Sequence, residues 1–180
     1  MERNSFAVWL TGLPGSGKSV ISESLKDLLK QQGIECQILR MDEMRKYVTP
    51  EPKYTDEERQ LIYNAFVFSA KLLVENDVNV IMDATGNRRK YRALAKEIIP
   101  HYFEIFLKCP LEIAIKREIE RENTKDAPEN IYQRGIEGET ETVPGLQVEY
   151  EEPLEPDFVI ETHKCQIDEC AQHIASFLLG

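Results

Sequence analysis

The sequence predicts an α/β fold of the P-loop NTPase type, with a five-stranded parallel sheet, helices on both faces and a lid segment. Short apolar runs alternate with amphipathic helical patterns along the chain. A glycine-rich stretch lies between the first apolar run and the first helical pattern. The length of 180 residues and the 42% hydrophobic composition suit one packed domain over residues 1–180.

The strands are predicted from short, mainly apolar runs, which are typical of strands buried on both faces of a parallel sheet. They are expected at 6–11, 35–40, 78–83, 103–108 and 157–162. Ligands are expected at the carboxyl ends of these strands.

The helices are predicted from apolar residues that recur on one helical face and from their end signals. They are expected from Lys18 to Gly33, from 55 to about 75, and at 87–99, 110–123 and 166–178. The second of these opens with the capping box "TDEE", and the fourth has proline in its first turn. Residues 123–156, rich in proline, glycine and carboxylates, are expected to be a mobile excursion that supplies the lid, at about 123–150.

The overall charge restricts the partners. The formal net charge is −10, from 32 acidic and 22 basic residues. Such a surface repels phosphate backbones and anionic lipids, so we expect a small-molecule partner and neither a nucleic-acid polymer nor a membrane. The sequence shows no secretory leader and no apolar run of about 18–20 residues, so a cytoplasmic location is expected.

The four cysteines are expected to be free thiols, as in a reducing compartment. Cys36 and Cys109 lie in apolar segments and are interpreted as core residues. Cys165 and Cys170 are five residues apart, which is a poor spacing for one helical face, so a metal site is not expected there.

The strongest motif is "GLPGSGKS", which matches G-x-x-x-x-G-K-[ST] between a strand and a helix. Its glycines let successive amides point at phosphate oxygens, and the helix adds the positive end of its dipole. Lys18 is expected to reach the β- and γ-phosphates, and the Ser19 hydroxyl to bind Mg²⁺. ATP is the expected nucleotide, because no N-K-x-D guanine motif occurs. The predicted nucleotide-binding residues are Gly12, Leu13, Pro14, Gly15, Ser16, Gly17, Lys18, Ser19 and Val20.

Polar residues follow the next two strands. Asp42 stands just beyond the second strand, where a carboxylate can accept a proton from an incoming hydroxyl, and Arg45 lies one helical turn later. Asp83 ends the third strand and can hold magnesium through water. Arg88 and Arg92 are four residues apart and can grip phosphate. The alternative at each site is structural: the aspartate would be a helix cap and the arginines would be solvated surface charges.

Four further basic residues are candidates to close over the triphosphate as a lid, or are simple surface charges. They are Arg117, Arg121, Lys125 and Arg134.

The stretches "GLPGSGKS", "LRMDEMR" and "YQRGIEGETETVPGLQVEYEEPLEPDFVIET" occur in the order and approximate spacing of the adenylyl-sulfate kinases, which the chain resembles over almost its whole length. That family transfers the γ-phosphoryl group of Mg·ATP to the 3′-hydroxyl of adenosine 5′-phosphosulfate (APS), giving PAPS. The resemblance implies catalytic roles for Lys18 and Asp42, substrate-binding roles for Arg45 and Arg59, and an adenine contact for Arg117. It also implies a homodimer.

The substrate side departs from the family pattern. Arg40 and Met41 stand where the family has the first Asp and the Gly of D-G-D-x-x-R, and "DATGN" at 83–87 replaces its I-S-P loop. "QLIYNAF" stands in place of E-N-I-R-R, and "ENI" in place of Lys-Gly-Leu. Two alternatives therefore stay open: a related P-loop kinase for another nucleotide-like or sugar alcohol, and a non-catalytic ATP-binding module.

Overall fold

The computed structural model describes residues 5–121 and 130–180. Within them, five parallel strands form one sheet in the order β2-β3-β1-β4-β5, which confirms the predicted fold class. Because every pairing is parallel, each connection between paired strands crosses over a face of the sheet. The strands are β1 (Ala7–Thr11), β2 (Cys36–Arg40), β3 (Asn79–Asp83), β4 (Tyr102–Lys108) and β5 (Phe158–Glu161).

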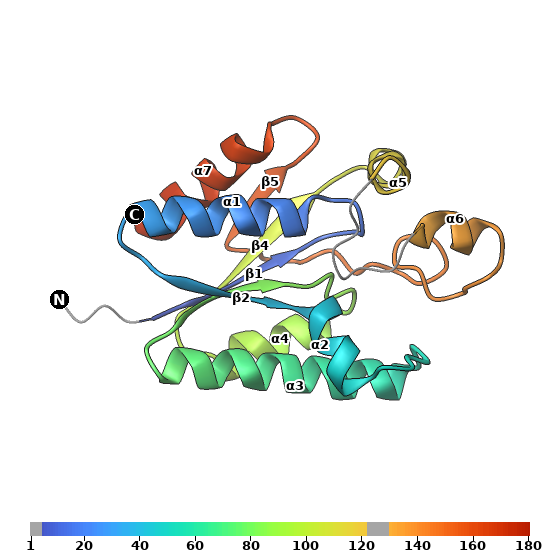
Figure 1. Ribbon diagram of the computed structural model, residues 1–180, viewed down its shortest axis with the longest axis horizontal. Helices are drawn as coiled ribbons and strands as arrows, with labels where there is room; N and C mark the ends of the chain where they lie inside the picture. The colour runs from blue at the N-terminus through green and yellow to red at the C-terminus, as the bar shows by residue number, and fades with distance from the viewer. Residues whose placement is uncertain (1–4, 122–129) are drawn as a thin grey trace.

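Helices cover both faces of the sheet (Figure 1). One face packs against α1 (Lys18–Gln31) and α7 (Ile167–Leu179), and the other against α3 (Asp56–Glu75) and α4 (Arg89–Ile98). Every residue of β1 is fully buried, because alternate side chains enter the two cores on opposite faces. Packing on both faces thus holds β1 in place, and the phosphate loop begins directly after its carboxyl end, at Gly12.

Three shorter helices lie beyond the carboxyl ends of the strands: α2 (Met41–Val48), α5 (Leu111–Ile119) and α6 (Ile131–Ile136). Pro110 is the N-cap of α5, and α5 ends at Ile119, earlier than the predicted end at residue 123. The short helix α6 forms within the segment that was expected to be an excursion. The first part of the predicted lid, residues 123–129 with Lys125, lies outside the described residues.

The start of α3 supports half of the predicted capping box. The Thr55 hydroxyl accepts a hydrogen bond from the Glu58 amide, over 3.2 Å. The Glu58 carboxylate does not return this bond to Thr55; it accepts from the amides of Lys53 and Tyr54 and from Arg45. This carboxylate therefore joins α3 to α2 and to the loop between them.

The cysteine prediction is half right. Cys36 and Cys109 are free and buried, as expected. Cys165 and Cys170 form a disulfide, so the expectation that all four thiols are free was wrong. The helical-face argument does not apply, since Cys165 lies in the turn before α7 and only Cys170 lies in the helix. The turn brings the two Cα atoms to 6.1 Å, within the range that a disulfide spans.

In residues 5–121 and 130–180, no helix is both long and apolar enough to cross a membrane.

Candidate active site

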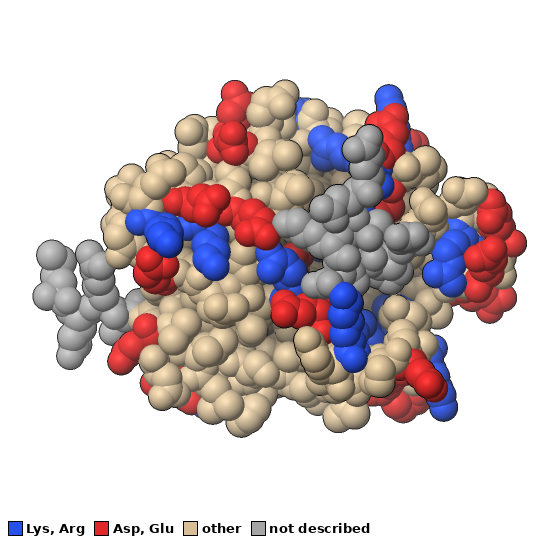
Figure 2. Space-filling model, in the orientation of Figure 1, with Lys and Arg blue, Asp and Glu red and all other residues tan. Residues whose placement is uncertain are grey.

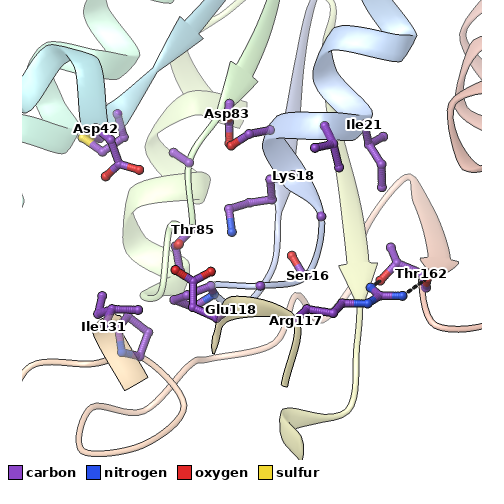
Figure 3. A pocket seen from close by; sticks show the side chains of 18 of the residues that line it. Ser16, Lys18, Ile21, Asp42, Asp83, Thr85, Arg117, Glu118, Ile131 and Thr162 are labelled. Atoms are coloured by element: carbon purple, nitrogen blue, oxygen red, sulfur yellow. Dashed lines mark hydrogen bonds between the residues drawn. The ribbon is translucent and has the colours of Figure 1, made fainter. Parts of the chain in front are cut away.

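A cleft of about 720 Å³ opens at the carboxyl ends of the strands, between the phosphate loop, α2, the residues after β3, and the α5 and α6 region (Figure 3). The structure brings most of the predicted site residues to it. Those that line it are Pro14, Gly15, Ser16, Gly17, Lys18, Ser19, Val20, Asp42, Arg45, Arg59, Asp83, Arg117, Arg121 and Arg134. Gly12 and Leu13, the first two residues of the loop, do not line the cleft; their carbonyls accept hydrogen bonds from Lys18.

The phosphate loop has the backbone that its glycines were expected to allow. Gly15 and Gly17 have φ values of +78° and +98°, which side-chain-bearing residues rarely adopt. A Cβ at Gly15 would also collide with the carbonyl of Ala114 in α5. The Ser16 hydroxyl is buried and has no hydrogen-bond partner among the described residues. A buried donor of this kind, in a glycine-bent loop at a helix start, fits a phosphate oxygen.

Lys18 begins α1 and extends into the space bounded by Asp42, Thr85 and Glu118 (Figure 3). Its ammonium group donates to the carbonyls of Gly12 and Leu13, over 3.1 and 2.9 Å. Burial lowers the pKa of Lys18, while Asp83, Asp42 and Glu118 act in the opposite direction. The ammonium is thus held against the loop with carboxylates around it.

Asp42 lies in the first turn of α2, on the other side of the cleft from Ser16. Burial, and then the charge of Asp83, raise the pKa of Asp42, while Lys18 and Arg45 oppose the shift. A carboxylate with a raised pKa is a stronger proton acceptor than an ordinary aspartate. Its position can therefore serve a hydroxyl that attacks a phosphoryl group near Lys18.

Two arginines and a tyrosine form the wall beside Asp42. The guanidinium carbons of Arg45 and Arg59 lie 5.0 and 5.5 Å from the centre of the Tyr54 ring. Arg45 pairs with Glu58 over 3.2 Å. Arg59 is buried and donates to the Tyr54 carbonyl, and further to Asn87 and to the Thr142 carbonyl. This wall combines fixed positive charge with an aromatic face, which suits a planar anionic ligand.

Ser19 and Asp83 offer the oxygen ligands that Mg²⁺ prefers. Ser19 lies in the first turn of α1, and the Asp83 carboxylate is buried at the end of β3. The described residues contain no group of three or more His, Cys, Asp or Glu arranged for a metal. The pair fits a Mg²⁺ ion that takes its remaining ligands from phosphate and water. Arg40 also approaches this place, with Nε 3.9 Å from Asp83 Oδ2.

Arg117 lies at the opposite end of the cleft (Figure 3). Its guanidinium donates to the Thr162 carbonyl over 2.8 Å and to the Thr162 hydroxyl over 3.3 Å. These bonds join α5 to the end of β5. The cleft here also has the Cys165–Cys170 disulfide in its wall.

Arg88 and Arg92 are not brought to the cleft. Arg88 forms an ion pair with Glu151 over 3.1 Å. Arg92, four residues later, is buried and forms an ion pair with Glu104. Arg92 also donates to the carbonyls of Gly86 and Glu151. Both arginines therefore hold the segment around residue 151 against the start of α4.

Sequence reasoning missed several cleft residues. Tyr54 precedes α3 with a φ of +55°, and no motif marks it. Asn87 is buried and bonds Arg59 and the Glu149 carbonyl; its place in "DATGN" was the available signal. Glu118 is buried beside Lys18 and directly follows Arg117. Nothing in the sequence distinguishes it from Glu112, the other glutamate of α5.

A phosphate loop with its lysine, the Ser19 hydroxyl, the Asp83 carboxylate and a further carboxylate, Asp42, in one cleft are typical of a P-loop phosphotransferase with a hydroxyl acceptor. A profile of the family described as Adenylylsulphate kinase matches residues 4–161. The chain therefore belongs to the adenylylsulphate kinase family.

Individual relatives agree with this assignment. The chain is 31% identical over 160 residues to a probable adenylyl-sulfate kinase of Archaeoglobus fulgidus, covering 89% of this chain and 97% of that one. It is 30% identical over 177 residues to an adenylyl-sulfate kinase of Halothermothrix orenii, covering 98% and 91%. Among solved structures, it resembles the Mycobacterium tuberculosis APS kinase CysC in complex with AMPPNP and APS. The TM-score is 0.87 at 26% identity, and the match covers 98% of this chain and 99% of that one.

Proposed function

We propose that this protein is an adenylyl-sulfate kinase, which transfers the γ-phosphoryl group of ATP to the 3′-hydroxyl of APS and releases PAPS and ADP. The observation that carries the proposal is the position of Asp42, which faces Lys18 across one cleft, with Arg45 and Arg59 beside it. The full-length similarity to adenylyl-sulfate kinases, and to a structure with AMPPNP and APS, supports APS as the acceptor.

The nucleotide would lie along the phosphate loop. The loop amides and Lys18 would hold the β- and γ-phosphates, and the buried Ser16 hydroxyl would donate to a phosphate oxygen. Ser19 and Asp83 would hold Mg²⁺, which neutralises phosphate charge when bound. The base would lie toward Arg117 and Thr162, at the far end of the cleft.

The acceptor would lie against α2 and Tyr54. Asp42 would accept a hydrogen bond from the 3′-hydroxyl and so align its oxygen with the γ-phosphorus. As transfer proceeds, the bond between the γ-phosphorus and the β–γ bridging oxygen breaks, and a bond to the 3′-oxygen forms. The hydroxyl proton passes to Asp42, and the bridging electron pair leaves with ADP. Arg45 and Arg59 would hold the negative charge of APS, and Tyr54 would contact its base.

The described charges also support a small-molecule acceptor. On the face shown in Figure 2, basic and acidic side chains are interspersed and form no continuous basic band among the described residues. The described residues of this face therefore offer no track for a nucleic-acid strand, in line with the net charge of −10.

The direct test is incubation with γ-labelled ATP and a parallel set of acceptors. The set is APS, cytidine nucleotides and a 5′-hydroxyl oligonucleotide. The proposal expects label in PAPS alone. Label in another acceptor would instead identify a related P-loop kinase. ATP binding without any labelled product would identify a non-catalytic module.

A further inference from the structure

A second buried carboxylate, Glu118, and the arginine Arg121 line the same cleft as the phosphate loop; Arg121 has so far been only one of four candidate lid residues, and Glu118 has no role. Glu118 lies in α5 with 3% of its side chain exposed, and Arg121 follows the end of that helix. Arg121 Nη2 lies 2.8 Å from Glu118 Oε1. Because the carboxylate is almost fully buried, this pair fixes the guanidinium where α5 meets the cleft.

Arg121 reaches both halves of the site. Both Glu118 and Arg121 line the cleft, and Figure 3 shows Glu118 pointing into it beside Thr85, below Lys18. The positive charge of Arg121 adds to the burial that lowers the pKa of Lys18, and it opposes the burial that raises the pKa of Asp42. A cation that influences both groups lies near the junction between the nucleotide and its acceptor.

The guanidinium also retains donors for a ligand. Arg121 Nε is buried and has no hydrogen-bond partner within residues 5–121 and 130–180. Arg121 Nη2 forms the ion pair with Glu118 but, like Nε, makes no hydrogen bond among the described residues, so both nitrogens of the planar fork can donate to a ligand. Two cations, Lys18 and Arg121, thus line one cleft together with the carboxylates Asp42, Asp83 and Glu118. The repulsion between the two cations is unfavourable by itself, and the arrangement becomes favourable when an anion lies between them.

We propose that Arg121 is a further catalytic residue, which donates hydrogen bonds to the γ-phosphoryl group as it is transferred, and that Glu118 is the positioning residue that holds it. The inference rests on the proposed function for the acceptor, but the contact with the γ-phosphoryl group does not depend on which hydroxyl is used. Arg121 forms no bond to phosphorus; it stabilises charge on the phosphoryl oxygens.

The test compares Arg121→Gln with Lys116→Gln. Lys116 is a matched control, because it lies on α5, is 73% exposed and pairs with a glutamate, Glu120, away from the cleft. Two quantities are measured: the single-turnover rate of transfer, and the ratio of affinities for AMPPNP and ADP. Arg121→Gln is expected to slow transfer about 10²–10³-fold, the scale of one preorganised contact to developing charge. Arg121→Gln is also expected to weaken the binding of AMPPNP about tenfold or more and to leave the binding of ADP unchanged. Lys116→Gln is expected to change neither the transfer rate nor the affinity ratio.

The variant Glu118→Gln tests whether Glu118 acts by positioning the Arg121 guanidinium. It is expected to slow transfer as well, and the double variant with Arg121→Gln should be no slower than Arg121→Gln alone, because both act through one guanidinium. Arg121→Lys keeps the charge without the fork and should recover part of the rate. If Arg121→Gln unfolds the protein, this lysine variant carries the test, with a rate well below wild type expected.

An unchanged AMPPNP-to-ADP ratio in a folded Arg121→Gln or Arg121→Lys variant would overturn the inference, as would fully additive effects of the Glu118 and Arg121 substitutions. The affinity ratio is read without any acceptor. A wild-type protein that makes no PAPS would therefore refute the proposed function. The role of Arg121 would still be decided by the ratio of the AMPPNP and ADP affinities.

Discussion

The hydroxyl of Tyr132 donates a hydrogen bond to the carbonyl of Pro14, over 3.0 Å. Tyr132 lies in α6 and is fully buried, and Pro14 lies in the phosphate loop, 118 residues earlier in the chain. Burial raises the pKa of the Tyr132 phenol, so it stays a donor at all ordinary pH values. One side chain thus joins α6, which lies in the predicted lid segment, to the loop that would hold the triphosphate.

Tyr132→Phe should therefore weaken ATP binding more than catalysis. Loss of the bond leaves a loop carbonyl unpaired, which costs about 1 kcal/mol, so we expect KM for ATP to rise about 3–10-fold. Steady-state kinetics with varied ATP measures this. Tyr47→Phe is the control, since Tyr47 is 82% exposed and should behave as wild type. A Tyr132→Phe enzyme with unchanged KM would show that the lid does not depend on this contact.

Asp42→Asn should leave ATP binding intact and remove most of the transfer rate. In the wild type, the rate should fall as pH drops through the pKa of Asp42, because the protonated carboxyl cannot accept the hydroxyl proton. Burial raises that pKa, so this acid limb should lie at higher pH than for an ordinary aspartate. The pH profiles of both forms give the test. Equal losses of ATP affinity and rate would make Asp42 a structural residue instead.

The same carboxylate should reduce stability. An aspartate whose pKa is raised in the folded state keeps a proton that the unfolded chain has already released. Stability therefore falls as pH rises from the ordinary pKa through the raised one, and stays lower above it. Asp42→Asn removes this loss and should raise Tm at pH 7 by about 2–4 °C, the shift that ~1 kcal/mol gives for a chain of this size.

Thermal unfolding at several pH values checks this account. The gain from Asp42→Asn should disappear at pH values below the ordinary aspartate pKa, where both states are protonated. Asp27→Asn, at an exposed position on α1, should show no gain at any pH. A lower Tm for Asp42→Asn at pH 7 would mean that the carboxylate stabilises the fold.

Gly15→Ala should abolish nucleotide binding, and Gly33→Ala should not. Both glycines have similar positive φ values, +78° and +75°, so the backbone strain of an alanine is similar at the two sites. A Cβ at Gly15 meets the Ala114 carbonyl, whereas a Cβ at Gly33 meets nothing within 4 Å. Binding of a labelled ATP analogue to the two variants isolates the steric effect. Equal binding by both would contradict the packed phosphate loop.

The sheet and the phosphate loop could be predicted from the sequence because their signals are local. The apolar run at β1, the glycines and Lys18 all fall within residues 6–19. The fates of Arg88 and Arg92 could not be predicted in this way. Helical spacing puts the two arginines near each other, but their partners Glu151 and Glu104 are distant in sequence. Only the packed fold shows that these carboxylates hold the arginines away from the cleft.

The acceptor wall is also non-local. Tyr54 meets Arg45 and Arg59 because the loop between α2 and α3 folds back, and the Arg59 guanidinium reaches Thr142, 83 residues later. The family resemblance predicted substrate-binding roles for Arg45 and Arg59, but not for Tyr54, which lies between them. The homodimer and the cytoplasmic location stay predictions.

A crystal structure of the protein with AMPPNP, Mg²⁺ and APS tests the central claim most directly. We expect the γ-phosphate among the amides of residues 12–19 beside Lys18, and the 3′-hydroxyl of APS within hydrogen-bond distance of Asp42. An AMPPNP triphosphate bound outside the phosphate loop, or APS bound away from Asp42, would contradict the account.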